Sequence, residues 1–534
     1  MSRLKTTVSS TIIAILFFAL LEFACRVFSF PGTYDYIERC VIEQRLAQKK
    51  APGEYRILLY GESTMQGSNL APKSTIGKWF TLYFDNLLPE EISRRVTVTN
   101  FGRLGEDSEF ISRSFIETLS YKPDLAVFYT AHNDFIQPIH RKRLFSPKSF
   151  RAVFDDLFHV ISRNSSLISL IKREAVRAKI ARHKRRNEAL QKIDVWYHES
   201  KEPTCNPNTD FLCPGSVQYE KLAARWKRNV DLIVDTAKRA SVPIVLLEGV
   251  ARWEEYEPYQ SLHDPSLTND VLAEWNNAFG NAQDLFAAGS YAEALAVYRT
   301  CTSLDGMYAH AYYRAGQCHQ KLGDYKMANE LYARANDLDH FPLRGPALVN
   351  QYYESLRKKK EAGVFIIPTE QLFEANAPNG IIDDTLIFDQ IHPNIKGQAL
   401  IALEIAKTMY ENGLLAKKTQ WRWDRLKTVE ELSKRLELNN EFRFSMYVLC
   451  AGYVRNDPDK AINNLKKALE YKPSSVQARS WLAWLYWKKG EKKEALTIYA
   501  RLRSEFPSLA EAFFKTHPKI ARELSQWSPA ERQP

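Results

Sequence analysis

Five short apolar runs, spread widely along the chain, constrain its fold more than any other feature. Each is rich in β-branched or aromatic residues and lacks a regular alternation of apolar and polar positions, which is typical of strands buried on both faces of a parallel sheet. The runs lie in RILLYGES (56–63), RRVTVTNFGRLG (94–105), PDLAVFYTAHND (123–134), VPIVLLEGV (242–250) and GVFIIPTEQ (363–371). Helix-compatible stretches such as 219–240 lie between them. The sequence therefore predicts an α/β fold, a three-layer domain with a parallel sheet between helices.

A second periodicity, of 34 residues, runs through two other parts of the chain. One motif recurs position by position, with Gly289, Tyr291, Ala294 and Tyr298 repeated as Gly323, Tyr325, Ala328 and Tyr332. Ala461 and Ala495 are separated by the same 34 residues. A period of this length, with small residues where helices cross, resembles the tetratricopeptide repeat, in which each unit is a pair of helices.

These two patterns divide a chain of 534 residues that is too long for one ordinary core. We expect one repeat pair to be inserted between two strands of the α/β domain and a second pair to follow that domain. The expected segments are an N-terminal anchor at 1–30, an α/β domain at 54–273 and 341–415, inserted repeats at 274–340 and C-terminal repeats at 440–515. Two repeats are fewer than usually stand alone, so each pair should pack on a neighbouring part of the chain.

Residues 8–25, VSSTIIAILFFALLEFAC, form a hydrophobic run just long enough to cross a bilayer, which takes about 20 helical residues. A cleaved signal peptide would have a shorter apolar region and a small-x-small cleavage site. We therefore expect an uncleaved signal anchor. Such an anchor predicts a single-pass membrane protein whose α/β domain lies outside the cytoplasm, in a periplasm or at the cell surface.

The charge of the chain permits binding to anionic surfaces, because its net value is +11. Residues 172–192 hold nine Lys or Arg against two Glu, which fits a solvated basic helix or, alternatively, a helix on a membrane surface. No nucleic-acid motif accompanies this run, and no Cys/His spacing predicts a zinc site. Cys205 and Cys213 lie in one Pro-rich loop, where they form a disulfide in an oxidising compartment or remain free thiols.

Ser63 follows the first predicted strand, where it is either a helix cap or a nucleophile. A nucleophile needs a base, a group that orients the base, and donors for the developing oxyanion. Asp389 lies three residues before His392, a spacing that lets the carboxylate hold one imidazole nitrogen while the other accepts a proton. Gly105 and Asn133 follow two other predicted strands and are candidate donors.

Taken in order, these blocks resemble the SGNH (GDSL-type) hydrolase family over about residues 54–415. The matching blocks are Gly61-Glu62-Ser63, Gly105 following Asn100, Ala131-His132-Asn133-Asp134, and Asp389-Gln390-Ile391-His392. The chain departs from the family pattern at Glu62, where the family has Asp, and at Ala131, where it has Gly.

The resemblance implies a role for each residue of the site. Ser63 would be the nucleophile, and His392, oriented by Asp389, would be the general base and then the general acid. The amides of Ser63 and Gly105, with the side chain of Asn133, would form the oxyanion hole. The resemblance implies neither a metal nor another cofactor.

The activity that the resemblance implies is that of a serine esterase or acylhydrolase, removing a short acyl group from a glycan or lipid ester. One alternative is an O-acyltransferase that uses the same site. Another is a scaffold whose repeats bind a protein partner and whose hydrolase site is vestigial. His132 and Arg344 are candidate substrate contacts, with a polar rim position and a salt bridge as their respective alternatives.

Overall fold

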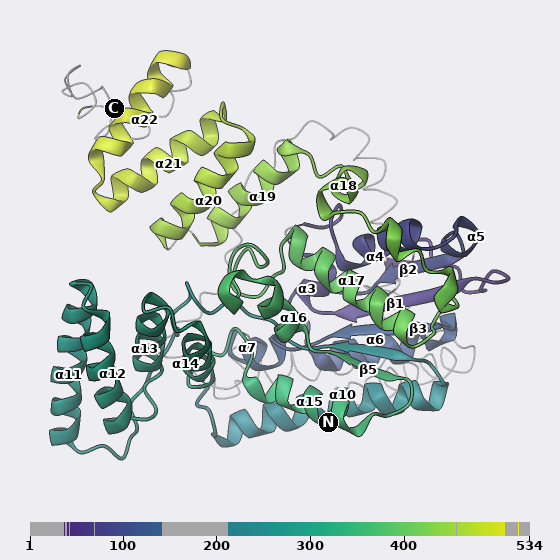
Figure 1. Ribbon diagram of the computed structural model, residues 1–534, viewed down its shortest axis with the longest axis horizontal. Coiled ribbons are helices and arrows are strands. Elements are labelled where there is room, and N and C mark those ends of the chain that lie inside the picture. Colours follow the sequence, from purple (N-terminus) through teal and green to yellow (C-terminus); the bar gives the residue numbers. More distant parts are fainter. Residues whose placement is uncertain are drawn as a thin grey trace, which may run out of the picture.

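The structure is a computed structural model, and Figure 1 shows an α/β domain with two helical segments beside it. It describes residues 43–68, 70–140, 212–454 and 457–507, together with Ile37, Cys40, Val41 and Arg522. The expected anchor at 8–25, the basic run at 172–192 and Cys205 lie outside these residues, so the predictions made for them stay predictions. Within the described ranges, no helix combines the length and the apolar character needed to cross a membrane.

A five-stranded sheet forms the centre of the α/β domain, and all its neighbouring strands run parallel. In spatial order the strands are β2 (Val96–Asn100), β1 (Tyr55–Gly61), β3 (Leu125–Tyr129), β4 (Ile244–Leu247) and β5 (Val364–Ile367). The residues of β3 and β4 are all buried, as are those of β1 after its first residue. This burial on both faces explains the missing alternation in the sequence, and the predicted parallel sheet is confirmed.

Helices cover both faces of the sheet (Figure 1). Helix α4 (Ile76–Leu87) packs against α17 (Ile395–Glu411), and α6 (Ser108–Thr118) packs against α10 (Val217–Ala240). The described part of this domain also contains the α-helices α3 (Ser63–Gln66), α5 (Glu90–Ser93), α7 (Asn133–His140), α15 (Ala347–Lys359), α16 (Thr369–Asn376) and α18 (Val429–Ser433).

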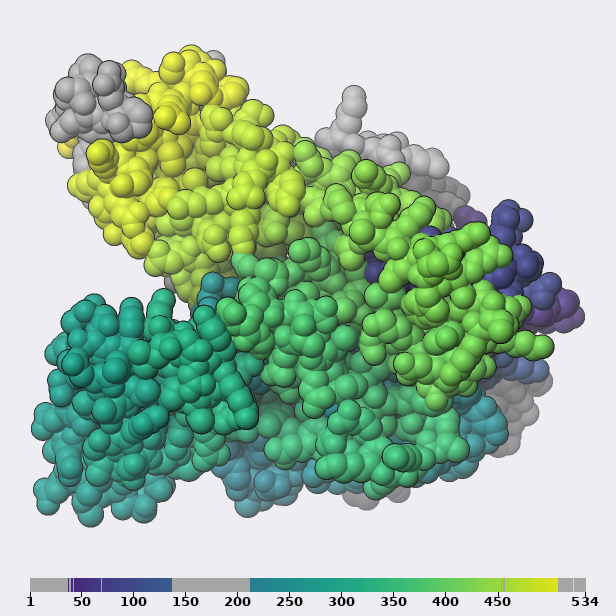
Figure 2. Space-filling model, viewed as in Figure 1, coloured from purple at the N-terminus to yellow at the C-terminus, as the bar shows by residue number. Residues whose placement is uncertain are grey.

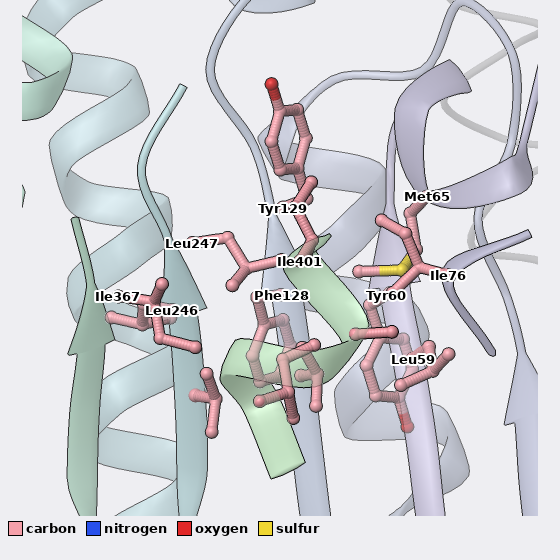
Figure 3. Packing of buried hydrophobic residues seen from close by; sticks show 14 of the residues in the cluster. Leu59, Tyr60, Met65, Ile76, Phe128, Tyr129, Leu246, Leu247, Ile367 and Ile401 are labelled. Carbon is pink, nitrogen blue, oxygen red and sulfur yellow. The ribbon is translucent and has the colours of Figure 1, made fainter. Parts of the chain in front are cut away.

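The core of the domain joins the strands to these helices (Figure 3). Leu59, Phe128 and Leu246 come from three neighbouring strands and are fully buried. Ile76 from α4 and Ile401 from α17 belong to the same cluster. Each such side chain contributes about 1.5–3 kcal/mol by leaving water, so this cluster is the main source of stability for the sheet and the strand ends that it carries.

Between β4 and β5 the chain forms the inserted repeats. Their helices are α11 (Asn269–Ala287), α12 (Tyr291–Leu304), α13 (Ala309–Lys321) and α14 (Tyr325–Asp337). The helices pack in consecutive pairs, and the recurring residues Ala294 and Ala328 are fully buried where they do so. Tyr298 and Tyr332, four residues further on in each unit, are buried as well. Small residues let the helix backbones approach each other. Each repeat needs such a residue at the same place, so the residue recurs every 34 positions.

The C-terminal repeats consist of α19 (Asn440–Tyr453), α20 (Pro458–Tyr471), α21 (Val476–Lys489) and α22 (Lys492–Glu505). Ala461 and Ala495 are fully buried, as in the inserted pair. Lys467 of α20 forms an ion pair with Asp384 of the α/β domain. Figure 2 shows the two repeat segments as two lobes beside that domain, teal for the inserted pair and yellow for the C-terminal pair.

Candidate active site

Ser63 lies at the carboxyl end of β1, as the first residue of the short helix α3. Gly61 permits this tight junction, because a Cβ there would lie 2.6 Å from the Met65 Cβ and 2.7 Å from the Tyr129 carbonyl oxygen. The chain can therefore turn from the strand into the helix without a clash. The result is a nearly buried serine, 4% exposed, at the edge where parallel sheets carry their sites.

His392 and Asp389 meet Ser63 at this edge. The His392 Nε2 lies 2.7 Å from the Ser63 Oγ, and the His392 Nδ1 lies 2.6 Å from the Asp389 Oδ2. The second carboxylate oxygen of Asp389 accepts the backbone N–H groups of Ile391 and His392 at 2.9 and 2.8 Å. A tight turn thus holds the carboxylate in place, and the carboxylate in turn orients the imidazole towards the serine.

The charges of the pair depend on each other. Burial alone would raise the pKa of Asp389, but the His392 charge and the hydrogen bonds at its carboxylate hold that pKa below its ordinary value. Burial alone would lower the pKa of His392, but the Asp389 carboxylate, helped by Glu62, raises that pKa above its ordinary value. The site therefore favours an imidazolium beside a carboxylate, the charge pair that forms when a histidine removes a proton from a serine.

Asn133 and Gly105 come shortly after the two strands on either side of β1, which are β3 and β2. Asn133 begins α7, and its Nδ2 donates one hydrogen to the Glu106 carbonyl at 2.9 Å, a bond that does not use the second amide hydrogen. Gly105 has a φ of 72°, a left-handed conformation that favours glycine. The residues predicted as oxyanion donors thus follow neighbouring strands at the edge of the sheet that carries Ser63.

Glu62 has a structural role that the sequence did not reveal. Its carboxylate is 1% exposed and accepts the backbone N–H groups of Ala131, His132 and Asn133 at 2.9–3.3 Å. It therefore ties the start of α7 to the residue before the nucleophile. No local pattern predicts this contact, because its partners are main-chain groups about 70 positions away.

Ala131, the other departure from the family pattern, is accommodated by Gly249, which lies two residues after the end of the next strand, β4. A Cβ on Gly249 would lie 2.6 Å from the Ala131 methyl group. The Ala131 methyl group therefore fits because residue 249 has no side chain.

His132 and Arg344 occupy buried positions next to this site. His132 is 1% exposed, and within the described ranges neither of its ring nitrogens has a hydrogen-bond partner. Arg344 forms a buried ion pair with Asp339 at 3.1 Å and donates a hydrogen bond to the Tyr256 carbonyl. The salt bridge considered for Arg344 is therefore present, whereas His132 is buried and not a rim residue. Both side chains line one pocket.

In the part of the chain that the structure describes, no group of three His, Cys, Asp or Glu side chains is arranged to hold a metal ion.

Sequence comparison identifies the helical segments. Residues 279–339 and 455–513 each match a tetratricopeptide repeat family. These segments are tetratricopeptide repeats. The 34-residue period is thus confirmed as a tetratricopeptide pattern in both parts of the chain. No curated protein matches the sequence.

Solved structures give more distant likenesses. A GDSL-like lipase from Bacteroides thetaiotaomicron shares 10% identity over 71% of this chain and 100% of its own, with a TM-score of 0.27. A candidate acylhydrolase from Bacteroides fragilis shares 11% identity over 71% and 98%, with a TM-score of 0.28. A tetratricopeptide protein from Thermus thermophilus shares 18% identity over 45% and 97%, with a TM-score of 0.14. Likeness at this level carries no argument about chemistry, which rests on the atoms of the site.

Proposed function

We propose that this chain is a serine ester hydrolase of the SGNH type, which forms an acyl-enzyme on Ser63. The observation that carries the proposal is the continuous hydrogen-bonded series from the Ser63 hydroxyl through His392 to Asp389, with steps of 2.7 and 2.6 Å. This is the arrangement that activates a serine hydroxyl in acyl transfer. The order of the sequence blocks supports the same assignment.

The proposed mechanism has two halves. His392 takes the Ser63 proton as the Ser63 oxygen attacks the acyl carbon, and the imidazolium then protonates the departing alcohol. Water, deprotonated by the same imidazole, then attacks the acyl-enzyme. The acid is released as the imidazolium returns the proton to the departing Ser63 oxygen. In both halves the N–H groups of Ser63 and Gly105 and the Asn133 amide would stabilise the oxyanion, and removing one such donor typically costs about 10²–10³ in turnover.

Hydrolysis of a nitrophenyl acetate ester by protein lacking residues 1–30 tests this function. Ser63→Ala should reduce the rate to the background, because no other group forms the acyl-enzyme. Ser114→Ala is a matched control, since Ser114 is also buried but its hydroxyl only donates to the Phe110 carbonyl within α6. A Ser63→Ala protein as active as the wild type would eliminate the proposal.

We also propose that residues 8–25 anchor the enzyme to a membrane, with the α/β domain on the extracytoplasmic side. The length and hydrophobicity of the run support this location. Protein expressed at full length should stay in the membrane fraction after a carbonate wash, whereas protein lacking residues 1–30 should not. Equal release of the two proteins would refute the anchor.

The repeats support a proposal about partners. Tetratricopeptide repeats generally mediate protein–protein contacts, so we propose that at least one of the two segments binds a protein partner. Proteins captured by the full-length chain should be lost when the C-terminal repeats, residues 440–534, are deleted. An unchanged set of captured proteins would reject a partner for that segment.

A further inference from the structure

A polar pocket lies next to the proposed active site, between the inserted repeats and the α/β domain. Its empty space comes to about 440 Å³, a figure that includes the part open to solvent. Helix α14 of the repeats contributes Asn336 and Asp337, while His132 and Trp253 come from the segments that follow β3 and β4. His132 directly precedes Asn133, so the pocket begins beside the proposed oxyanion donor.

Four side chains that line the pocket carry buried polar atoms for which the described part of the chain offers no hydrogen-bond partner. These atoms are Oδ1 of Asn336, Nε1 of Trp253, Nε of Arg344 and both ring nitrogens of His132, of which Nδ1 lies 3.7 Å from the Glu62 Oε2, beyond hydrogen-bond distance. A buried polar atom without a partner costs about 1–3 kcal/mol. A ligand that supplied the missing partners would remove this cost, so the unpartnered atoms point to a bound molecule.

The types of these atoms define the ligand. Trp253 and Arg344 can only donate, the Asn336 oxygen can only accept, and a neutral imidazole does both. Hydroxyl groups donate and accept, so a molecule with several hydroxyls satisfies the whole set, whereas an acyl chain satisfies none of it. The carboxyl groups of Asp337 and Glu370 also line the pocket and would repel a phosphate, a sulfate or an acidic sugar when ionised.

We propose that this pocket binds a neutral sugar unit of the substrate, and that the inserted repeats form one wall of the sugar site through α14. The inference rests on the proposed ester hydrolase and narrows its substrate from a glycan or lipid ester to a glycan ester. The proposal also explains why the repeats are inserted at this point of the chain, since α14 then forms a wall of the pocket. The insert follows β4 and precedes α15, and the pocket brings its last helix, α14, together with residues that follow β3 and β4.

The test is a ligand-observed NMR titration of the full chain carrying Ser63→Ala. Methyl glycosides of glucose, mannose and N-acetylglucosamine are the neutral probes, glucuronate is the anionic probe and decanoate is the acyl probe. At least one neutral glycoside should bind. Trp253→Phe, which removes an unpartnered N–H and keeps an aromatic ring, should weaken its binding by about three- to tenfold.

Trp423→Phe is the matched control. The Trp423 indole N–H is also buried and lacks a partner among the described residues, but its ring packs on Tyr410 and Trp421, away from the pocket. This variant should bind the glycoside as the parent does. The proposal is overturned if no neutral glycoside binds, if Trp253→Phe leaves the affinity unchanged, or if glucuronate or decanoate is the probe whose binding that variant weakens.

Kinetics separates the failure of this inference from the failure of the proposed function. If neither nitrophenyl acetate nor an acetylated methyl glycoside is hydrolysed by the wild type, the esterase proposal fails, while the NMR titration still decides the sugar site. If both are hydrolysed, Trp253→Phe should lower the ratio of kcat/KM for the glycoside to that for nitrophenyl acetate by about three- to tenfold, through KM. An unchanged ratio would overturn the sugar site alone.

Discussion

His392 and Asp389 stay charged where burial opposes the charge on each of them. Burial favours a neutral carboxyl and a neutral imidazole, but the contact between the two groups lowers the pKa of Asp389 and raises that of His392. At the scale of single residues, the pair is therefore the feature on which the proposed chemistry depends. Its pH dependence can be predicted with a definite sign.

Activity requires neutral His392, so kcat/KM should increase as the pH rises through a pKa above the ordinary value of about 6.5. Asp389→Asn removes the carboxylate that raises this pKa, so the increase should move to lower pH. The rate on the alkaline plateau should also fall by about 10⁴, because the amide no longer holds the correct tautomer. Asp264→Asn is the control, because this half-exposed carboxylate accepts hydrogen bonds from Ser266 within its own turn. An Asp389→Asn profile with an unshifted acidic limb would contradict this account.

Asp134 is buried beside Asp107, and burial is the main cause that raises its pKa to about 7. Because this folded-state pKa exceeds the unfolded value of about 3.9, its contribution to stability is complete below pH ~3.9 and is lost as the pH rises through about 7. Asp134→Asn stays neutral and keeps an acceptor for the Ser108 N–H. The melting temperature of the variant minus that of the wild type should therefore be larger at pH 8 than at pH 5. Equal differences at both pH values would refute the predicted ionisation.

At the scale of elements, what the sequence predicted depended on how local each signal is. The buried strands and the 34-residue repeats leave continuous patterns, and Asp389 lies only three residues from His392. The contact between Ser63 and His392 spans 329 positions, so only the order of the blocks indicated it. Nothing in the sequence indicated that Glu62 would bind three backbone N–H groups, or that α14 would line a pocket, because both depend on how distant loops meet.

Glu62 joins two elements of the site, so its removal should affect both stability and turnover. Glu62→Ala leaves the N–H groups of Ala131, His132 and Asn133 without their acceptor and should cost about 1–3 kcal/mol in the free energy of unfolding. It should lower kcat more than it raises KM, because Asn133 loses its position. Glu62→Gln keeps one acceptor oxygen, so its stability and its kcat should lie between those of the wild type and Glu62→Ala. Urea denaturation and ester kinetics measure both effects, and a fully stable, fully active Glu62→Ala would refute the role.

At the scale of the whole molecule, helix α19 links two hydrophobic cores. Its residues Met446 and Cys450 belong to the core of the α/β domain, whereas Phe444 and Ala451 belong to the core of the C-terminal repeats. The two cores are otherwise separate clusters. The chain should therefore unfold in more than one step, with α19 as the shared element.

Two core substitutions test this division. Met446→Ala should destabilise the α/β domain. Leu465 is fully buried in the repeat cluster, so Leu465→Ala should destabilise the C-terminal repeats. Each should cost about 2–5 kcal/mol. Loss of ester hydrolysis reports on the first domain, and far-ultraviolet circular dichroism reports on both. If Leu465→Ala lowered the temperature at which activity is lost as much as Met446→Ala does, the two cores would be one cooperative unit.

The central claim is that one serine of this chain is activated by its neighbours, and covalent labelling tests it most directly. Protein treated with a fluorophosphonate should carry a single adduct, which mass mapping should locate on Ser63. The adduct should be absent from His392→Ala, which keeps the serine but removes the base. An adduct on another serine, or no adduct on the folded wild-type protein, would contradict the account.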